Sequence, residues 1–323
     1  MIKNARLILG LILSLFLMGQ PLAAAAQEQE PESTVDEIIV IARRSGAPMW
    51  IIEQGGHTLI LVGSLQGMPR DLQWSPDDLE AAAARSDRIL FPPEGRASPM
   101  DLLRIMWRIR TIGWLPRDTT TADYLSPEVQ ARLETAMAGE RNDNWRTQSL
   151  LMLGIDLLQE KAGYDRGGRD AVDVVRRASR RAHVPGEPVG IVRGDELVES
   201  LISSPPTTHA PCLEASLAAA EAGKDEFRNR ANAWRRFNVA AVVASPLDRA
   251  LFQCWPWGDP EIGPQLKTAW LSAIETALGQ DGVTMAVAPT RLLAEPGGVL
   301  DDLEARGFNI EGPTWRYAED ETP

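Results

Sequence analysis

The hydrophobic pattern near the N-terminus predicts a β-hairpin. Residues 49–52 and 59–62 are uninterrupted apolar runs, and the segment between them contains Gly55 and Gly56. Glycine adopts without strain the positive φ angles that a tight hairpin turn requires. We therefore expect two paired strands joined at these glycines.

A helix and a third strand are predicted after the hairpin. Ser75-Pro76-Asp77-Asp78 supplies a helix cap, a proline for the first turn and early acidic residues, so a helix should run from about residue 76 to residue 85. Residues 87–91 then predict a strand, which Pro92-Pro93 terminates because proline cannot donate to a β-ladder. The order of elements is strand, loop, helix, strand.

The C-terminal part of the chain repeats this order. It predicts a strand at 283–287, a loop at 288–291, a helix at 298–306 and a short strand at 308–310. The tetrapeptide Asp-Leu-Glu-Ala at 78–81 recurs at 302–305, at the same place in the series. In such a repeat, Gln66 and Arg291 occupy equivalent positions. They lie in loops at the carboxyl ends of neighbouring strands, which line a common crevice in folds of this kind.

The stretch between the two units is predicted to be mainly helical. Helical spacing or caps mark six segments, namely 100–107, a helix that starts at Ser126, 148–162, 171–182, 213–237 with a break near Gly223, and 265–278. The predicted fold class is therefore α+β, with a mixed β-sheet built from N- and C-terminal strand-loop-helix-strand repeats and a large helical insert. We expect a single domain over residues 39–316, at the upper end of the size range for one core.

The first 26 residues have the plan of a secretory signal peptide. Lys3 and Arg6 precede an apolar run at 7–18, and residues 23–26 are alanines suited to cleavage. A retained membrane anchor is the alternative, but the run is shorter than the roughly 20 residues of a membrane span. No cysteine follows the alanines, which argues against a lipoprotein.

Two further terminal segments are polar and are expected to lie outside the folded domain. Residues 27–38 are acidic and polar and predict a disordered leader, and residues 317–323 form an acidic tail. No later stretch is apolar enough to span a bilayer. The mature protein is therefore expected in the periplasm or outside the cell.

The two cysteines fit an oxidising compartment. Cys212 and Cys254 are the only cysteines, and an even count there favours a disulfide, worth about 4 kcal/mol from chain entropy. A free nucleophilic cysteine is the alternative, with His209, near Cys212, as the candidate base, although no histidine is adjacent in sequence to either cysteine. His57 is interpreted as a hairpin-turn residue and His183 as a helix-end residue, and no two histidines have the spacing of a zinc-binding helix.

Charge and aromatic content narrow the possible partners. The formal net charge is −12, and the basic cluster formed by Arg176, Arg177, Arg180 and Arg181 is interpreted as a solvated helix face, so nucleic acid is not an expected partner. Trp255-Pro256-Trp257 is a candidate sugar platform, although core packing or contact at the rim of a site is the favoured interpretation.

Five segments of the chain together resemble the TraB/GumN family, which is related to the Tiki metalloproteases and more distantly to the erythromycin-esterase and ChaN-like proteins. Gly63-Ser64-Leu65 resembles the family's Gly-Ser-Leu-His element, with Gln66 in place of the histidine. Residues 84–91 resemble the strand that leads to a glutamate, which here is replaced by Pro92 or displaced to Glu94. The resemblance covers nearly all of the expected mature chain.

The other three segments also keep the apolar frame and lose the polar residues. Segment 163–191 resembles a glycine-led helix and a strand that ends in Leu-Glu, with Val192-Arg193 in place of that pair. Segment 266–270 keeps a tryptophan, Trp270, and loses the family's arginine. Segment 286–292 resembles Ala-Val-Gly-Ala-Gly-His-Leu, with Arg291 in place of the histidine.

The resemblance therefore implies a metal-hydrolase frame without its ligands. A hydrolytic site needs imidazole or carboxylate groups that converge on a divalent ion. Glutamine is a poor neutral donor and arginine has no lone pair to donate. We expect no metal and no other cofactor, and no catalytic residue can be assigned.

Two functional hypotheses follow. In the first, the protein is secreted and inactive as a metallohydrolase, and the former cleft, lined by Gln66, Arg193 and Arg291, binds a ligand or partner. The arginines point to an anionic ligand or to another protein of the cell envelope. In the alternative, the protein is a peptidase- or esterase-like hydrolase with a rebuilt site that uses Glu94 and Asp71, and a divalent metal if one is needed.

Overall fold

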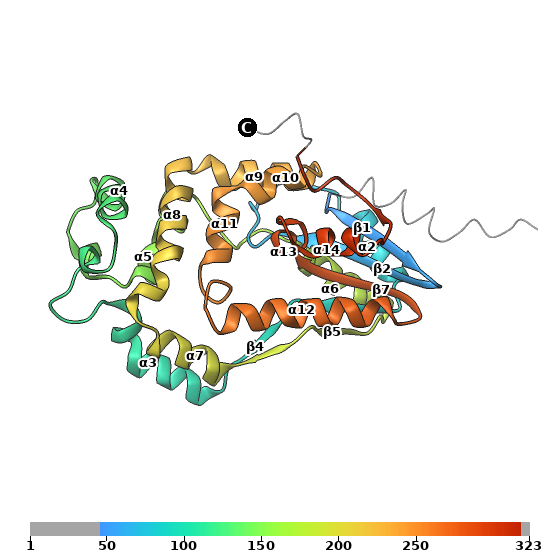
Figure 1. The fold of residues 1–323 in the computed structure, drawn as a ribbon, viewed down its shortest axis with the longest axis horizontal. Coiled ribbons are helices and arrows are strands. Elements are labelled where there is room, and N and C mark those ends of the chain that lie inside the picture. The colour runs from blue at the N-terminus through green and yellow to red at the C-terminus, as the bar shows by residue number, and fades with distance from the viewer. Residues whose placement is uncertain (1–45, 318–323) are drawn as a thin grey trace, which may run out of the picture.

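A six-stranded mixed sheet forms the centre of the computed structural model, which describes residues 46–317 (Figure 1). The strands are β1 (Met49–Gln54), β2 (His57–Ser64), β3 (Arg88–Phe91), β5 (Gly186–Pro188), β7 (Gly282–Pro289) and β8 (Ile310–Glu311). Their order in the sheet is β5-β3-β7-β2-β1-β8. A separate pair, β4 (Glu94–Arg96) and β6 (Ile191–Arg193), forms a two-stranded parallel sheet.

The sheet joins the two ends of the chain. β1 and β2 form the predicted antiparallel hairpin, and Gly55 and Gly56 have φ angles of 57° and 94°. β7, from the C-terminal part, lies between β2 and β3 and runs parallel to both. The α+β class and the mixed sheet built from both ends, with a large helical insert between them, are thereby confirmed.

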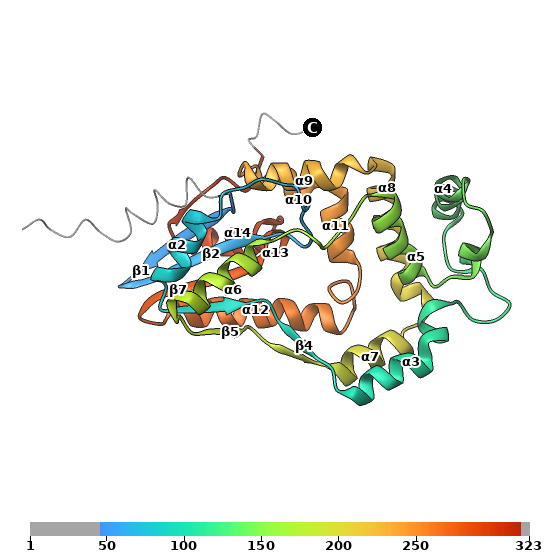
Figure 2. The same ribbon diagram turned by 180° about the vertical axis from the view of Figure 1, so that it is seen from behind.

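Helices cover both faces of the sheet because alternate strand residues point to opposite sides. Ile51 and Ile60 pack with α2 (Asp77–Arg85) and α6 (Ala171–Ala182) on one face, whereas Trp50 and Leu61 pack with α12 (Ile262–Leu278) on the other. Figure 2 shows α2 and α6 in front of the strands. The second face is also covered by α13 (Thr290–Ala294) and α14 (Val299–Ala305).

A helical lobe extends from one end of this layered unit (Figure 1). Its helices are α3 (Pro99–Gly113), α4 (Pro127–Met137), α5 (Leu150–Asp156), α7 (Gly194–Ser203), α8 (Ala210–Ala222) and α11 (Pro246–Gln253). Helices α9 (Asp225–Arg235) and α10 (Val239–Ala244) lead from the lobe back to the sheet. A π-helical turn at Leu157–Lys161 continues α5, and 3-10 turns lie at Thr121–Asp123, Asn144–Thr147 and Pro206–His209.

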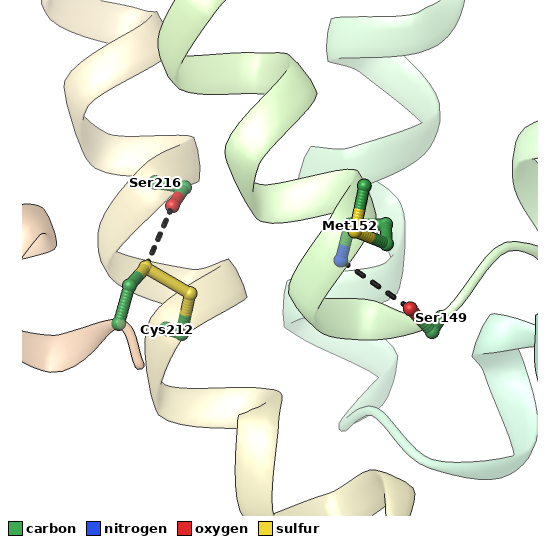
Figure 3. Close-up of a disulfide and its surroundings, with 5 residues drawn as sticks. Ser149, Met152, Cys212 and Ser216 are labelled. Carbon is green, nitrogen blue, oxygen red and sulfur yellow. Dashed lines mark hydrogen bonds between the residues drawn. A yellow bond between two sulfur atoms is a disulfide. The ribbon is translucent and has the colours of Figure 1, made fainter. Parts of the chain in front are cut away.

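The two cysteines hold part of this lobe together. The sulfur atoms of Cys212 and Cys254 lie at disulfide distance, 2.03 Å apart, and join the first turn of α8 to the end of α11 (Figure 3). Both residues are buried, and Ser216 Oγ lies 3.7 Å from Cys254 Sγ. The pairing agrees with the prediction, and its place among packed helices is that of a structural cross-link.

Several elements differ from the sequence prediction. The strand expected near 188–191 is divided between β5 in the large sheet and β6 in the small one. Helices α7, α10 and α11 were not predicted. The expected signal peptide (1–26), leader (27–38) and most of the acidic tail lie outside the described residues. Within residues 46–317, no helix has the length and apolar character that a membrane span requires.

Candidate functional site

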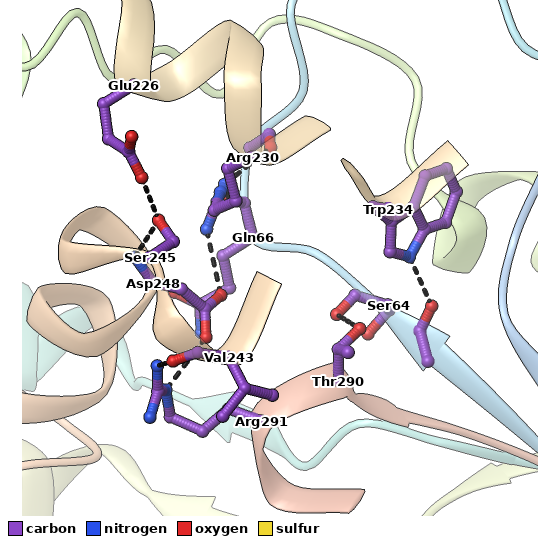
Figure 4. Close-up of polar contacts among 12 residues, drawn as sticks. Ser64, Gln66, Glu226, Arg230, Trp234, Val243, Ser245, Asp248, Thr290 and Arg291 are labelled. Carbon is purple, nitrogen blue, oxygen red and sulfur yellow. Dashed lines mark hydrogen bonds and ion pairs between the residues drawn. The ribbon is translucent and has the colours of Figure 1, made fainter. Parts of the chain in front are cut away.

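The loops after β2 and β7 start side by side at the carboxyl edge of the sheet. In the parallel register, His57 is paired with Gly282 and Ser64 with Pro289, so the same offset carried two residues further aligns Gln66 with Arg291. Ser64 Oγ donates to the carbonyl oxygen of Ala288 at 3.0 Å, and Thr290 Oγ1 donates to the carbonyl oxygen of Ser64 at 3.0 Å (Figure 4). These two hydrogen bonds hold the loops together.

A close approach at this point requires glycine. A Cβ atom added to Gly63 would lie 2.9 Å from Thr290 Oγ1. The backbone of Gly63 is also used, since Trp234 Nε1 donates to its carbonyl oxygen at 2.8 Å. The Gly63-Ser64 pair is therefore explained by packing between the two loops, independently of any activity.

One cavity, of about 380 Å³, lies in the helical lobe. The loop after β2 opens into a different cavity, of about 320 Å³. This second cavity, here called the sheet-edge cleft, lies where the loops after β2, β3 and β7 meet the start of α6 and the Trp255-Pro256-Trp257 segment. Its polar lining residues are Ser64, Gln66 and Asp170. The rest of its wall is apolar or glycine, from Leu65, Pro92, Pro93, Gly95, Val172, Val192, Leu197, Trp255, Pro256, Trp257, Leu266 and Pro289.

Arg291 does not line the sheet-edge cleft. Its guanidinium is buried, with Nε 2.9 Å from Asp248 Oδ2 and Nη2 donating to the carbonyl oxygen of Val243 (Figure 4). The expectation that Arg291 faces Gln66 across an open cleft is therefore not met. The side chain turns toward α10 and α11 because a buried carboxylate there neutralises its charge.

That carboxylate is shared with a second arginine. Arg230, on α9, is fully buried and places Nη1 3.2 Å from Asp248 Oδ1. Burial lowers the pKa of Arg230 from its ordinary value, and the negative charge of Asp248 opposes this shift. Arg230 Nη2 also donates to the carbonyl oxygens of Gln66, at 2.5 Å, and Gly67, at 3.1 Å. The Arg230-Asp248-Arg291 network therefore fixes the backbone of the loop that carries Gln66.

Glu94 and Arg193 lie on the small β4–β6 sheet and also point away from the cleft. Their neighbours Gly95 and Val192 face each other in the β-register and line the cleft instead. The Glu94 carboxylate is exposed and lies 3.8 Å from Arg176. Arg193 is exposed and paired with Asp195 at 2.5 Å. Of the five predicted positions, Gln66 and Pro92 line the cleft, whereas Glu94, Arg193 and Arg291 do not.

The carboxylate pair of the alternative hypothesis is not assembled. Asp71 is exposed and pairs with Arg228 on α9, 2.8 Å away. This hydrogen bond lowers the pKa of Asp71. Neither Asp71 nor Glu94 is a lining residue of the cleft.

Asp170 is the carboxyl group that the cleft does contain, and the sequence did not single it out. It caps α6, because its Oδ1 accepts a hydrogen bond from the backbone N–H of Asp173 at 2.9 Å. Burial raises the pKa of the Asp170 carboxyl above its ordinary value, partly offset by that hydrogen bond. The available signal was an aspartate just before a helical run, which indicates a cap but does not reveal its place in a cleft.

The tryptophan segment contributes a donor without an acceptor. Trp255 Nε1 is buried and has no hydrogen-bond partner among the described residues. Trp257 stacks on Phe252, with ring centroids 4.7 Å apart. Buried donors of this kind are normally satisfied, so Trp255 is an exception beside the cleft. The polar groups of the lining itself are the Ser64 hydroxyl, the Gln66 amide and the Asp170 carboxyl, within an apolar wall.

The three histidines lie apart from the cleft. His57 Nδ1 is 3.2 Å from Asp281, His183 ends α6 with a φ of 58°, and His209 lines the 380 Å³ cavity. Burial lowers the pKa of His209. Across residues 46–317, no group of three or more His, Cys, Asp or Glu side chains is arranged to hold a metal ion.

The sequence model of the TraB/PrgY/gumN family matches residues 48–312, from β1 to the end of β8. The chain belongs to the TraB/PrgY/gumN family. Searches of curated proteins and of solved structures gave no match. The matched span includes the sheet, both loops of the sheet edge and the helical insert.

The residues of this TraB/PrgY/gumN chain do not fit the divalent metal that the family resemblance implies. Arg291 offers no lone pair and its charge is already bound to Asp248. Pro92 has no side-chain donor, and Gln66 is a weak neutral one. These groups therefore do not supply the ligand set of a hydrolytic metal centre.

Proposed function

We propose that this chain is an exported TraB/PrgY/gumN-family protein that binds a ligand or partner segment in the sheet-edge cleft and does not act as a metallohydrolase. The observation that carries the proposal is the Arg230-Asp248-Arg291 network. It contains two arginines and one carboxylate, so a net positive charge is buried beside the loop of Gln66. At the effective dielectric of a protein site, such a charge disfavours a nearby divalent cation by a few kcal/mol, to order of magnitude.

The lining of the cleft favours an uncharged, peptide-like ligand over the anionic one expected from sequence. Arg193 and Arg291 motivated the anionic ligand, and both are paired with carboxylates outside the cleft. The polar groups that remain are the Ser64 hydroxyl, the Gln66 amide and the Asp170 carboxyl, set among proline, leucine, valine and tryptophan. A peptide backbone supplies both acceptors and donors, and apolar side chains fill such a wall.

A second candidate, hydrolysis at a rebuilt site, rests on Asp170. Burial raises the pKa of the Asp170 carboxyl, which is the direction that a general acid requires. Glu94 and Asp71, the carboxylates first considered for this role, are engaged with Arg176 and Arg228. The cap that Asp170 provides to α6 explains the residue without catalysis, so binding remains the preferred function.

An array of 12-residue apolar and proline-rich peptides tests the proposal. We expect a subset to bind and Gln66→Ala or Asp170→Asn to weaken binding about tenfold. Leu271→Glu, an exposed position on α12, is the matched control and should leave binding unchanged. Equal binding by all variants, or no binding peptide, would refute the cleft as the site.

The same array separates the two candidates. Each bound peptide is recovered and its mass is measured. Intact peptides support binding alone. Cleavage that Asp170→Asn abolishes, while Gln66→Ala retains it, would instead support hydrolysis.

Export to the periplasm or the cell exterior is part of the proposal. The buried Cys212–Cys254 pair supports it, because disulfides persist mainly in oxidising compartments. The partner in that setting is another envelope protein or its peptide segment, and not nucleic acid. The basic cluster on α6 is consistent with this, since Arg181 pairs with Glu80 and Arg176 with Glu94. Cell fractionation, together with N-terminal sequencing of the mature chain, checks export and cleavage near residue 26.

A further inference from the structure

Helix α3 exposes an apolar face that the rest of the described chain does not cover. Figures 1 and 2 both show α3 beside α7, at the end of the molecule away from the large sheet. The side of α3 that is turned inward carries Asp101, which is buried, and Ile105 and Ile112, which are half-buried. These positions recur at helical spacing and define a single contact stripe.

The opposite side of α3 is apolar and exposed to solvent. Trp107 is 88% exposed and Met106 is 70% exposed. The complete exposed set is Met100, Leu102, Leu103, Met106, Trp107 and Ile109. At 100° per residue these six side chains span about half of the helix circumference. Isolated exposed apolar residues are common, but a continuous helical face of this size marks an interaction surface.

The charges on α3 are opposite in sign to the net charge of the protein. Arg104, Arg108 and Arg110 are exposed, and none of them forms an ion pair with another described residue. The one acidic residue of α3, Asp101, is used in the N-terminal capping box with Ser98. The helix is therefore locally basic within a chain of net charge −12.

We propose that α3 docks on an anionic lipid bilayer surface, with its apolar face inserted at the headgroup boundary. Interfacial helices combine tryptophan, leucine and similar residues on one face with arginine or lysine at its margin. In a helical projection, Arg104 and Arg108 lie about 40° and about 80° beyond the Met100 edge of the apolar arc, where long side chains can reach lipid phosphates. Arg110 lies within the arc near the C-terminal end. The helix has 15 residues and lies across the end of a folded lobe, so it would rest on the membrane and not cross it.

Charge disfavours a second copy of the chain as the occupant. In a two-fold interface the same patch meets itself. Two α3 faces would bring together six arginines that have no ion pair within residues 46–317, and the one acidic side chain of each helix, Asp101, is already used in the capping box. An anionic bilayer supplies that neutralisation. The acidic residues at the start of α7 do not, because Asp195 and Glu196 already face Arg193.

Hydrogen exchange on the full chain tests this directly. Exchange of the peptide covering 99–113 is measured alone, with phosphatidylglycerol-containing vesicles and with phosphatidylcholine vesicles. We expect slower exchange of this peptide with the anionic vesicles and little change with the neutral ones. This local readout is independent of any membrane binding by the N-terminal apolar segment at 7–18.

Vesicle co-sedimentation of variants provides the second arm. The double variant Met106→Glu/Trp107→Glu should lower the vesicle-bound fraction at least tenfold. The double variant Arg104→Gln/Arg108→Gln should reduce the ratio of binding to anionic over neutral vesicles about tenfold. Leu271→Glu, which changes an equally apolar exposed residue elsewhere, should bind as the wild type does. No protection of residues 99–113 on anionic vesicles would overturn the proposal. Concentration-dependent protection without vesicles would also overturn it, in favour of a second copy.

Discussion

The loops after β2 and β7 leave the same edge of the sheet in parallel register, yet their side chains have opposite surroundings. Gln66 lines a cleft of about 320 Å³. Its backbone carbonyl accepts a hydrogen bond from Arg230, whereas its side-chain amide has no hydrogen-bond partner among the described residues. Arg291 is buried in a network with Asp248 and Arg230. Equivalent positions in a sheet therefore do not imply a shared site. The outcome depends on whether the neighbouring helices supply a counter-charge.

The buried network should contribute far more to stability than the side chain of Gln66 in the cleft. Removing one member of a buried ion pair leaves an unpaired charge in a poorly solvated place, which is costly. Exposed or half-exposed polar side chains usually contribute within about 0.5 kcal/mol. Substitutions in the two loops should therefore differ widely in their effect on the free energy of unfolding.

Asp248→Ala should have the largest effect. It leaves Arg230 and Arg291 buried without a counter-charge, so the free energy of unfolding should fall by about 3–5 kcal/mol. Urea unfolding monitored by tryptophan fluorescence measures this change. Asp71→Ala, which removes the carboxylate of an exposed pair, is the control and should cost at most about 1 kcal/mol. Similar losses in the two variants would contradict the assigned role of the network.

Arg291→Met should cost much less than Asp248→Ala. The substitution leaves one arginine and one carboxylate, which remain balanced, and loses the hydrogen bonds of Arg291 to Asp248 and to the Val243 carbonyl. We expect a decrease of about 1–2 kcal/mol in the free energy of unfolding. A loss as large as that of Asp248→Ala would show that Arg291, and not the shared carboxylate, is the critical member.

Two substitutions of Asp170 separate its role as the cap of α6 from the effect of its charge on stability. Asp170→Ala removes the cap of α6 and should cost about 1 kcal/mol. Asp170→Asn keeps a capping oxygen and removes the charge. Because burial raises the pKa of Asp170 in the folded state, the wild type loses stability as the pH rises from the ordinary value of 3.8 through the folded-state pKa.

Asp170→Asn should therefore gain stability relative to the wild type over that same pH range. Urea midpoints of both proteins measured between pH 3.5 and pH 7.5 test the sign. A constant difference across this range would mean that the carboxyl is not perturbed by burial.

Gln66→Ala should have the smallest effect, within about 0.5 kcal/mol. The backbone carbonyl that Arg230 binds is retained, and only the side chain in the cleft is lost. Thermal unfolding is sufficient to measure this. A large loss would show that Gln66 belongs to the packed network and would remove the contrast between the two loops.

The layered core could be predicted from sequence because its signals are local. The turn glycines indicated the hairpin, and the run at 171–182 indicated a helix with the bounds observed for α6, Ala171–Ala182. The equivalence of positions 66 and 291 followed from the repeated order of elements and agrees with the register of β2 and β7.

The site could not be predicted because its partners come from distant parts of the chain. Asp248 is 43 residues before Arg291 and 18 after Arg230, and nothing in its local sequence marks it as buried. Successive residues of β4 lie on opposite sides of the strand, so Gly95 lines the cleft and Glu94 does not. Which of the two lines the cleft depends on the pairing of β4 with β6, which the local sequence does not indicate. Side-chain type alone therefore assigned two arginines to a cleft that they do not line.

We propose that this member of the TraB/PrgY/gumN family has lost its metal chemistry and retains a cleft for binding. Elemental mass spectrometry of tag-free, signal-processed protein after incubation with manganese, cobalt and zinc tests it most directly. We predict far less than one ion per chain, with no difference between the wild type, Gln66→Ala, Glu94→Ala and Asp170→Ala. Near-stoichiometric metal that is lost when any one of these residues is replaced would contradict the account.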